Sequence, residues 1–378
     1  LNLSRWEVLH NMSEYRFNQI AINSTEKKKP EESDKYTYIG LEHLDPMDLE
    51  VHRWGSEVAP KGEKLLMKKG DVLFGKRRAY QKKVAIAPFD GIFSAHGMVL
   101  RPNEKIVDKD FFPLFISSDY FLDAAIKISV GSLSPTINWR DLRELKFCLP
   151  DLKTQRKLAK VLWAINATMQ TYKVLLAKTD ELVKSQFIEL FGDPISEKLY
   201  KTKTIGEIGE VFTGTTPSTK KEEYYENKDI LFIKPGDISE NKVCIVDKAE
   251  NYISDKAKKV ARIFPKGSVL VTCIGIIGKI GIAEYESSCN QQINVIVPSP
   301  TVDSTYLAYN LLLVRSNLQD AANAPVVPIL NKTDFSKVEV MVPPYERQCE
   351  FATFVEQSDK SKFELNRALD ELTATYKQ

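Results

Sequence analysis

Two long stretches of the chain place apolar residues at alternating intervals of four and three, the spacing of a coiled-coil seam. In residues 151–191 these positions hold Leu158, Leu162, Ile165, Met169, Tyr172, Leu176 and Val183. In residues 344–378 they hold Phe351, Val355, Leu365, Leu369, Leu372 and Tyr376, interrupted by Ser358 and Lys362. We expect two long helices that pair in antiparallel fashion. The alternative is that each helix packs only on its own domain.

The two stretches belong to a repeat that covers the whole chain. The second seam lies 193 residues after the first, and Gln155 recurs as Gln348 at the same offset. Solenoid repeats are only about 20–50 residues long, so this period indicates duplicated domains. Before each long helix, short Val/Ile-rich runs between Lys-Gly, Pro-Gly and Asp-Gly pairs predict β-strands, and residues 111–128 and 304–322 are expected to be helical.

The expected fold class is therefore α+β, with two tandem β-rich domains that are each followed by a long helix. Gly192 and Pro194 supply the stop signal of the first helix. The expected boundaries are 1–150 and 195–343 for the two domains, and 151–194 and 344–378 for the two helices.

Composition narrows the class of protein without identifying a ligand. The formal net charge is +2, too small to indicate a nucleic-acid partner by itself. No apolar run reaches the roughly 18 residues of a membrane helix, and the first residues lack a secretory layout. The five cysteines never form a C-x-x-C pair. We expect a cytoplasmic protein with no structural zinc and no membrane partner.

Basic residues gather between positions 61 and 83 of the first domain, where cations outnumber acidic residues. Arginine can pair with guanine and lysine with DNA phosphates, so this region is a candidate DNA-binding site. A solvated loop is the alternative. The candidate DNA-binding residues of this domain are Arg53, Lys64, Lys76, Arg77, Arg78, Tyr80, Lys82 and His96.

In the repeat, the basic loop aligns with the glycine-rich segment 273–279, which has a single lysine. The two domains are therefore expected to read different sequences. Glutamine amides can pair with adenine, although amides that stabilise turns are equally common. The candidates of the second domain are Lys220, Lys221, Tyr224, Lys279, Gln291, Gln292 and Asn331.

Catalysis is the rival interpretation. A self-contained amino-methyltransferase needs a polar residue before Pro-Pro-aromatic, but Val342 precedes Pro343-Pro344-Tyr345, and no G-x-G-x-x-G loop is present. A nuclease could use Asp229, Glu240 and Lys242, a spacing that arises by chance in a charged chain. We expect no catalytic residue and no bound metal. A coiled-coil interaction scaffold without DNA readout is the remaining alternative.

The tandem arrangement resembles the specificity subunit of type I restriction-modification enzymes. The segments that carry the resemblance are the Pro-x-x-x-x-Gln openings of both long helices, 191–194, 213–217 and 38–44. The resemblance implies that each domain recognises half of a bipartite target in double-stranded DNA. It also implies that the helices space the half-sites and dock two methyltransferase subunits, which bind S-adenosylmethionine, while restriction-translocase subunits join the full complex. Such a subunit is not catalytic.

Two features depart from the family pattern. Thr154 and Arg347 stand where a glutamate usually precedes the shared glutamine. The second helix is also shorter than the first, as expected if the C-terminus is truncated.

Overall fold

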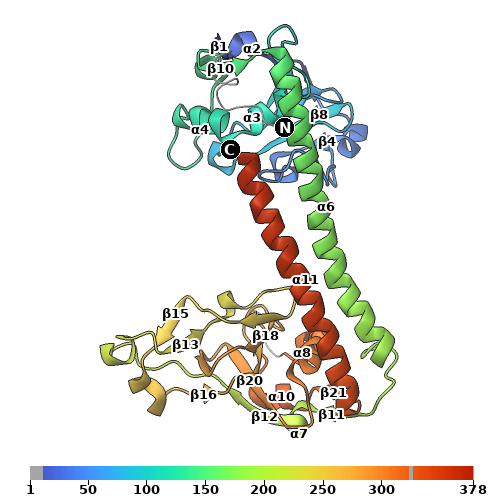
Figure 1. The fold of residues 1–378 in the computed structure, drawn as a ribbon, viewed down its shortest axis with the longest axis vertical. Coiled ribbons are helices and arrows are strands. Elements are labelled where there is room, and N and C mark those ends of the chain that lie inside the picture. Colours follow the sequence, from blue (N-terminus) through green and yellow to red (C-terminus); the bar gives the residue numbers. More distant parts are fainter. Residues whose placement is uncertain (1–11, 323–326, 378) are drawn as a thin grey trace. The chain divides into compact units, whose positions relative to one another are not determined.

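The computed structural model describes residues 12–322 and 327–377 of the chain. It contains two compact units, Leu1–Thr171 with Leu369–Gln378 (the N-terminal unit) and Tyr172–Ala368 (the C-terminal unit). Each unit has β-sheets and short helices, and the two long helices α6 (Leu152–Phe191) and α11 (Tyr345–Lys377) contribute residues to both (Figure 1). The fold is α+β, as predicted.

The N-terminal unit contains two four-stranded sheets and a two-stranded ribbon. One sheet has the order β2 (Ala21–Ser24), β9 (Met98–Pro102), β6 (Val72–Phe74) and β7 (Val84–Ile86). The other has the order β3 (Lys27–Lys28), β5 (Lys64–Met67), β8 (Gly91–Phe93) and β4 (Tyr38–Ile39). The ribbon pairs β1 (Met12–Arg16) with β10 (Lys146–Pro150). Their alternating, β-branched sequences bury one core beside each face of the first sheet.

The C-terminal unit repeats most of this topology. Its five-stranded sheet has the order β12 (Gly209–Thr213), β20 (Ile293–Pro298), β17 (Val269–Thr272), β18 (Ile280–Ala283) and β14 (Cys244–Val246). Its four-stranded sheet has the order β15 (Asn251–Ile253), β13 (Ile230–Ile233), β19 (Ser287–Cys289) and β16 (Ile263–Phe264). A ribbon pairs β11 (Thr202–Thr204) with β21 (Glu339–Met341). Both units have a parallel pair at the same place, β4 with β8 and β13 with β19, so the duplication predicted from sequence extends to the central strands. The C-terminal unit has a further parallel pair, β14 with β18, at the edge of its larger sheet.

Short helices complete each unit. In the N-terminal unit they are α2 (Phe17–Ile20), α3 (Phe112–Ser117), α4 (Asp119–Lys127) and α5 (Trp139–Leu142). In the C-terminal unit they are α7 (Ile205–Ile208), α8 (Ser304–Leu313), α9 (Arg315–Asp320) and α10 (Lys332–Lys337). The helical region expected over 111–128 is two helices because Ser118 is extended, and its Oγ accepts from Phe121 N at 3.3 Å to cap α4. The region expected over 304–322 also divides into two helices, at Val314.

The 3₁₀ helices are short segments next to strands. In the N-terminal unit they are η1 (Glu32–Tyr36), η2 (Leu41–His43) and η3 (Ala79–Gln81). In the C-terminal unit they are η4 (Glu222–Tyr224), η5 (Pro235–Asp237) and η6 (Asp255–Lys259).

The repeated glutamine anchors the start of each long helix. Gln155 Oε1 accepts from Asp108 N at 2.8 Å, while its Nε2 donates to the carbonyls of Ile106 and Pro150 at 3.0 and 2.7 Å. Gln348 repeats the arrangement with the amide of Asp303 and two carbonyls. Both glutamines are fully buried. A buried amide needs such partners, so the hydrogen bonds explain why this position is shared by the two copies.

The long helices pair within each unit. In the C-terminal unit, Phe351 of α11 packs edge-on against Phe187 and Phe191 of α6, and Lys362 Nζ lies 2.9 Å from Asp180 Oδ1. In the N-terminal unit, Leu372 lines a groove with Ile165. The contacts of later α11 residues with earlier α6 residues make the pairing antiparallel, as expected.

The predicted seam residues share a burial pattern. Met169, Val183, Phe351 and Val355 are buried, and the others are partly buried. The first helix ends where expected, because Gly192 has a φ of 79°, a conformation that glycine adopts readily. Among the described residues, no helix combines the length and apolar character required to span a membrane.

Candidate nucleic-acid interface

In the N-terminal unit, the basic loop between β6 and β7 has an unusual backbone. Arg78 and Lys82, on either side of η3, have φ angles of 53° and 50°. Left-handed conformations are uncommon for residues with a side chain and persist where their surroundings hold them. Arg78 N donates to Pro135 O at 2.8 Å, and Ile137 N donates to Lys76 O at 2.9 Å. The loop is therefore held by a second segment of the same unit.

The two arginines at the tip of this loop have no carboxylate partner within the described part of the chain. Arg77 Nη1 lies 3.4 Å from His96 Nε2, and Arg78 Nε lies 3.5 Å from Ser134 Oγ. Tyr80 is exposed beside them. Guanidinium groups that are exposed and not committed to acidic side chains can pair with base edges or phosphates.

His96 lies on the turn after β8, against the basic loop. Its pKa is lowered by partial burial and by the positive charges of Arg77, Lys76 and Lys64. The imidazole is therefore neutral at pH 7 and can both donate and accept a hydrogen bond.

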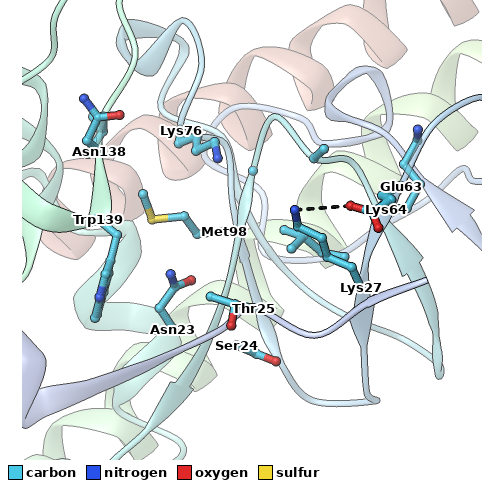
Figure 2. Close-up of a pocket in the computed structure, with 14 residues that line it drawn as sticks. Asn23, Ser24, Thr25, Lys27, Glu63, Lys64, Lys76, Met98, Asn138 and Trp139 are labelled. Carbon is cyan, nitrogen blue, oxygen red and sulfur yellow. Dashed lines mark hydrogen bonds and ion pairs between the residues drawn. The ribbon is translucent and has the colours of Figure 1, made fainter. Parts of the chain in front are cut away.

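Lys64 and Lys76 line a pocket of about 230 Å³ in the same unit. Burial lowers the pKa of Lys76, and the nearby charge of Lys27 lowers it further. Figure 2 shows Lys27 and Lys76 at this pocket together with Asn138 and Trp139. Sequence reasoning missed Lys27, Asn138 and Trp139, although the run of three lysines that starts at Lys27 was a visible signal.

Two predicted cations of this unit are held by acidic side chains. Lys82 Nζ lies 2.6 Å from Asp119 Oδ1 and 2.8 Å from Asp123 Oδ1, both on α4. Arg53 Nη2 lies 2.7 Å from Asp45 Oδ1. These ion pairs give both side chains a role within the unit itself.

The glycine-rich loop between β17 and β18 is held in the C-terminal unit as the basic loop is in the N-terminal unit. Leu330 N donates to Cys273 O at 2.9 Å, as Ile137 N does to Lys76 O. Gly275 N donates to Pro328 O at 3.2 Å, as Arg78 N does to Pro135 O. The two loops thus occupy equivalent places with different side chains, as the repeat predicts.

Lys279, the lysine of this loop, hydrogen-bonds within its own unit. Its Nζ donates to Pro235 O at 3.0 Å, and Lys83 makes the same kind of bond to Leu41 O in the N-terminal unit. The loop is held further by Arg315 of α9, which donates to Ile277 O at 3.2 Å.

Gln291 and Gln292 follow β19, where Ala95 and His96 follow β8. Asn290 Oδ1 accepts from Gln292 N at 3.1 Å, matching the contact of Ser94 Oγ with His96 N at 3.3 Å. Gln292 Oε1 accepts from Asn290, and Gln291 Oε1 accepts from Thr216 Oγ1 at 2.7 Å. The equivalent positions of the two units therefore present an imidazole and an amide.

The remaining candidates of the C-terminal unit are scattered. Tyr224 is buried and accepts a hydrogen bond from Lys221 Nζ at 3.1 Å, while Lys220 is exposed. Asn331 caps α10 by accepting from Asp334 N at 2.9 Å. The structure thus gives Asn331 and Tyr224 places in the fold that the sequence did not reveal.

The residues of the rival nuclease hypothesis have ordinary environments. Asp229 Oδ2 accepts from Asp255 N at 2.9 Å at the start of η6, and the backbone carbonyl of Glu240 accepts from Arg315. Over residues 12–322 and 327–377, no group of three or more His, Cys, Asp or Glu side chains is arranged to hold a metal ion.

Comparison with known protein families gives a match over nearly the whole chain. Residues 15–178 and 197–373 each match the type I restriction modification DNA specificity domain. The MjaIX specificity subunit of Methanocaldococcus jannaschii is 34% identical over 182 residues, which cover 46% of this chain and 42% of that protein. The HindI specificity subunit of Haemophilus influenzae is 24% identical over 371 residues, which cover 76% of this chain and 80% of that protein.

Solved structures show the same fold. A structure from a study of type I R-M system assembly has a TM-score of 0.62 at 17% identity and covers 98% of this chain and 96% of that chain. A type I restriction-modification S subunit from M. genitalium has a TM-score of 0.58 at 14% identity. The match covers 100% of this chain and 96% of that chain.

Proposed function

Because this chain belongs to the family of type I restriction-modification DNA specificity subunits and has two copies of its domain, we propose that each unit reads one half of a bipartite DNA sequence. The observation that carries the proposal is the equivalent placement of two different loops on a duplicated scaffold. Arg77 with His96 and the Gly275 loop with Gln292 occupy matching places in their units. A shared scaffold with different side chains suits recognition of two different half-sites.

In the N-terminal unit, Arg77, Arg78 and His96 are the proposed base readers. The exposed arginines can make paired hydrogen bonds to guanine, and the neutral imidazole can accept from or donate to a base edge. Lys64 and Lys76 add positive charge beside these residues, and Tyr80 packs beside the DNA backbone. Arg53 and Lys82 support the interface through their ion pairs.

In the C-terminal unit, Gln291 and Gln292 are the proposed base readers. Their amides suit adenine, and the glycine-rich loop lets DNA approach the backbone closely. Lys220 contacts phosphate, and Lys221 supports it through Tyr224. Lys279 and Asn331 support the interface indirectly, through their hydrogen bonds with Pro235 O and Asp334 N.

The proposed domain boundaries remain 1–150, 151–194, 195–343 and 344–378, with the helix pair as spacer. Half-site centres about 10 base pairs apart correspond to one DNA turn.

The long helices expose apolar side chains. On α6, Val174, Leu175 and Leu182 are 58%, 47% and 53% exposed, and Phe363 of α11 is 67% exposed. Such apolar residues suit partner docking. We assign this role to two methyltransferase subunits that bind S-adenosylmethionine, with restriction-translocase subunits in the complete cytoplasmic complex.

The subunit is not catalytic, so the direct test is binding. The full chain, with its methyltransferase partner, is titrated with a random-sequence duplex pool at several salt concentrations. We expect salt-dependent binding by the native chain, and at least about tenfold weaker binding of its preferred duplexes by the double variant Arg77→Ala/Arg78→Ala. Arg140→Ala, which alters an arginine with an 83% exposed side chain, is the matched control. Absence of duplex binding would favour an interaction scaffold without DNA readout.

A further inference from the structure

One pocket of the N-terminal unit has a charge balance that the fold does not explain. It lies where β2 and β5 meet the segment 137–139, and Lys27, Lys64 and Lys76 all line it. Glu63 is the one acidic side chain among its lining residues. Figure 2 shows Glu63 joined to Lys27, at a distance of 3.4 Å.

The other two lysines lack a carboxylate partner among the described residues. Lys64 Nζ donates to the carbonyls of Lys61 and Gly62, the latter at 3.1 Å. Lys76 is partly buried, and its side chain has no hydrogen-bond partner within residues 12–322 and 327–377. Partial burial of an unpaired ammonium group is unfavourable, and this environment lowers the pKa of Lys76.

Neutral polar groups accompany the lysines. Asn23 and Asn138 line the pocket and carry amide donors, and Ser24 also lines it. Ser24 is 7% exposed, and its Oγ has no hydrogen-bond partner in the described part of the chain. Buried hydroxyl groups are nearly always bonded, so an unmatched one beside unpaired cations indicates a missing polar ligand.

We propose that this pocket binds a phosphate group, supplied by the backbone of bound DNA. A phosphate oxygen accepts from ammonium, amide and hydroxyl groups, which are the donors present, and its charge removes the repulsion between Lys27 and Lys76. The DNA source rests on the proposed function, because the pocket is lined by Lys76, Ala95 and Gly97, the chain neighbours of Arg77 and His96. Lys76 is then a phosphate contact that positions the duplex beside the base-reading residues.

The first test uses inorganic phosphate and needs no DNA. Phosphorus NMR line broadening measures phosphate binding to the full chain, to Lys76→Met and to Lys105→Met. Lys105 is an exposed lysine outside the pocket, which makes it a matched control. We expect binding by the native chain and the control, and at least about tenfold weaker binding by Lys76→Met. Equal phosphate binding by all three proteins would overturn the proposal.

A second readout does not depend on a variant. Acetylation of Lys76, followed by mass spectrometry, should slow when phosphate is added, because a bound anion covers the amine and raises its pKa. Acetylation of Lys105 should not change. An unchanged rate at Lys76 would overturn the proposal even if the variant failed to fold.

The source of the phosphate is tested with a duplex. DNA should displace inorganic phosphate, and Lys76→Met should reduce the slope of log K against log salt by about 0.9, the effect of one lost phosphate contact. Phosphate binding without displacement or slope change would refute the DNA source and indicate a free phosphate compound. Duplex binding with no phosphate site would overturn the pocket and leave the proposed function standing.

Discussion

Lys362 of α11 places its Nζ 2.9 Å from Asp180 Oδ1 of α6, at a seam position where an apolar residue is expected. A second carboxylate, Asp359, lies 2.6 Å from the same Nζ. The Lys362 side chain is 18% exposed, whereas both carboxylates are more than 40% exposed. A polar residue in a helix seam can select one alignment of the helices at some cost in stability.

The first prediction concerns this ion pair. Lys362→Ala should lower the free energy of unfolding by about 1 kcal/mol, the upper end for pairs with exposed partners. Lys362→Met should cost less, because it keeps the apolar stem and removes the need for a charge partner. Urea unfolding measures both. Lys360→Ala, at a position where the side chain is 73% exposed, is the control and should change little. A larger loss in Lys362→Met than in Lys362→Ala would contradict this interpretation.

The pH dependence of the same pair has a defined sign. Burial alone lowers the pKa of Lys362, but the hydrogen bonds that its ammonium donates to Asp359 and Asp180 outweigh burial and raise the pKa above the ordinary value. The stabilisation is therefore complete below the unfolded-state pKa of about 10.4 and is lost as pH rises beyond it. Comparing native and Lys362→Met unfolding from pH 7 to 11 tests this. A difference that disappears already at pH 8 would contradict it.

The buried glutamines predict a stability effect that repeats in both units. Gln155→Ala and Gln348→Ala each leave a buried amide and two carbonyls without a partner, and should cost about 2–3 kcal/mol. Gln155→Glu should lower the free energy of unfolding at least as much, because its carboxylate would face two carbonyl oxygens. Acidification should reduce this loss, because a protonated carboxyl can donate to a carbonyl. Gln357→Ala, on the exposed side of α11, is the control. Calorimetry of the four variants measures the effects, and a neutral Gln155→Ala would contradict the anchoring role.

Lys82 is predicted to position the reading loop. Its ammonium is held by Asp119 and Asp123, so Lys82→Met should weaken DNA binding while the slope of log K against log salt stays the same. A lysine that contacts phosphate would instead reduce the slope by about 1 when removed. Lys82→Arg should restore binding, because it can keep the pairs. A reduced slope of log K against log salt in Lys82→Met would contradict this prediction and indicate that Lys82 contacts a phosphate.

A second pH dependence of stability is predicted from the environment of His96. Its pKa is lowered in the folded chain, first by burial and then by three neighbouring cations, so the unfolded chain binds the proton more readily. The native protein should therefore lose stability as pH falls below about 6.5, the unfolded-state value, and His96→Gln should lose less. Thermal unfolding between pH 5 and 7.5 measures the difference. Equal losses in both proteins would show that His96 titrates normally.

The sequence was most informative where the signal was periodic. The seams and the 193-residue repeat predicted both long helices, their pairing and the duplicated topology. The alignment of His96 with Gln292 also corresponds to equivalent places in the two units. These features depend on local spacing or on comparing the chain with itself, so a single sequence can reveal them.

The interface was harder to predict, because burial and charge pairing depend on residues far apart in the chain. Lys82 resembles its basic neighbours, but its acidic partners come 37 and 41 residues later. Lys27 joins Lys64 and Lys76 at a pocket only after β3 pairs with β5. Asn331 was a candidate DNA-binding residue, and the sequence did not reveal that its side chain caps α10. Tertiary partners of this kind leave no local pattern.

The central claim is that two different readers recognise two half-sites, and selection of bound duplexes from a random library tests it most directly. The full chain with its methyltransferase partner is used, beside Arg77→Ala/Arg78→Ala. We predict two short sequence blocks at a fixed gap near one DNA turn, with only one block lost in the variant. A single block, or no enrichment from the native protein, would contradict the account.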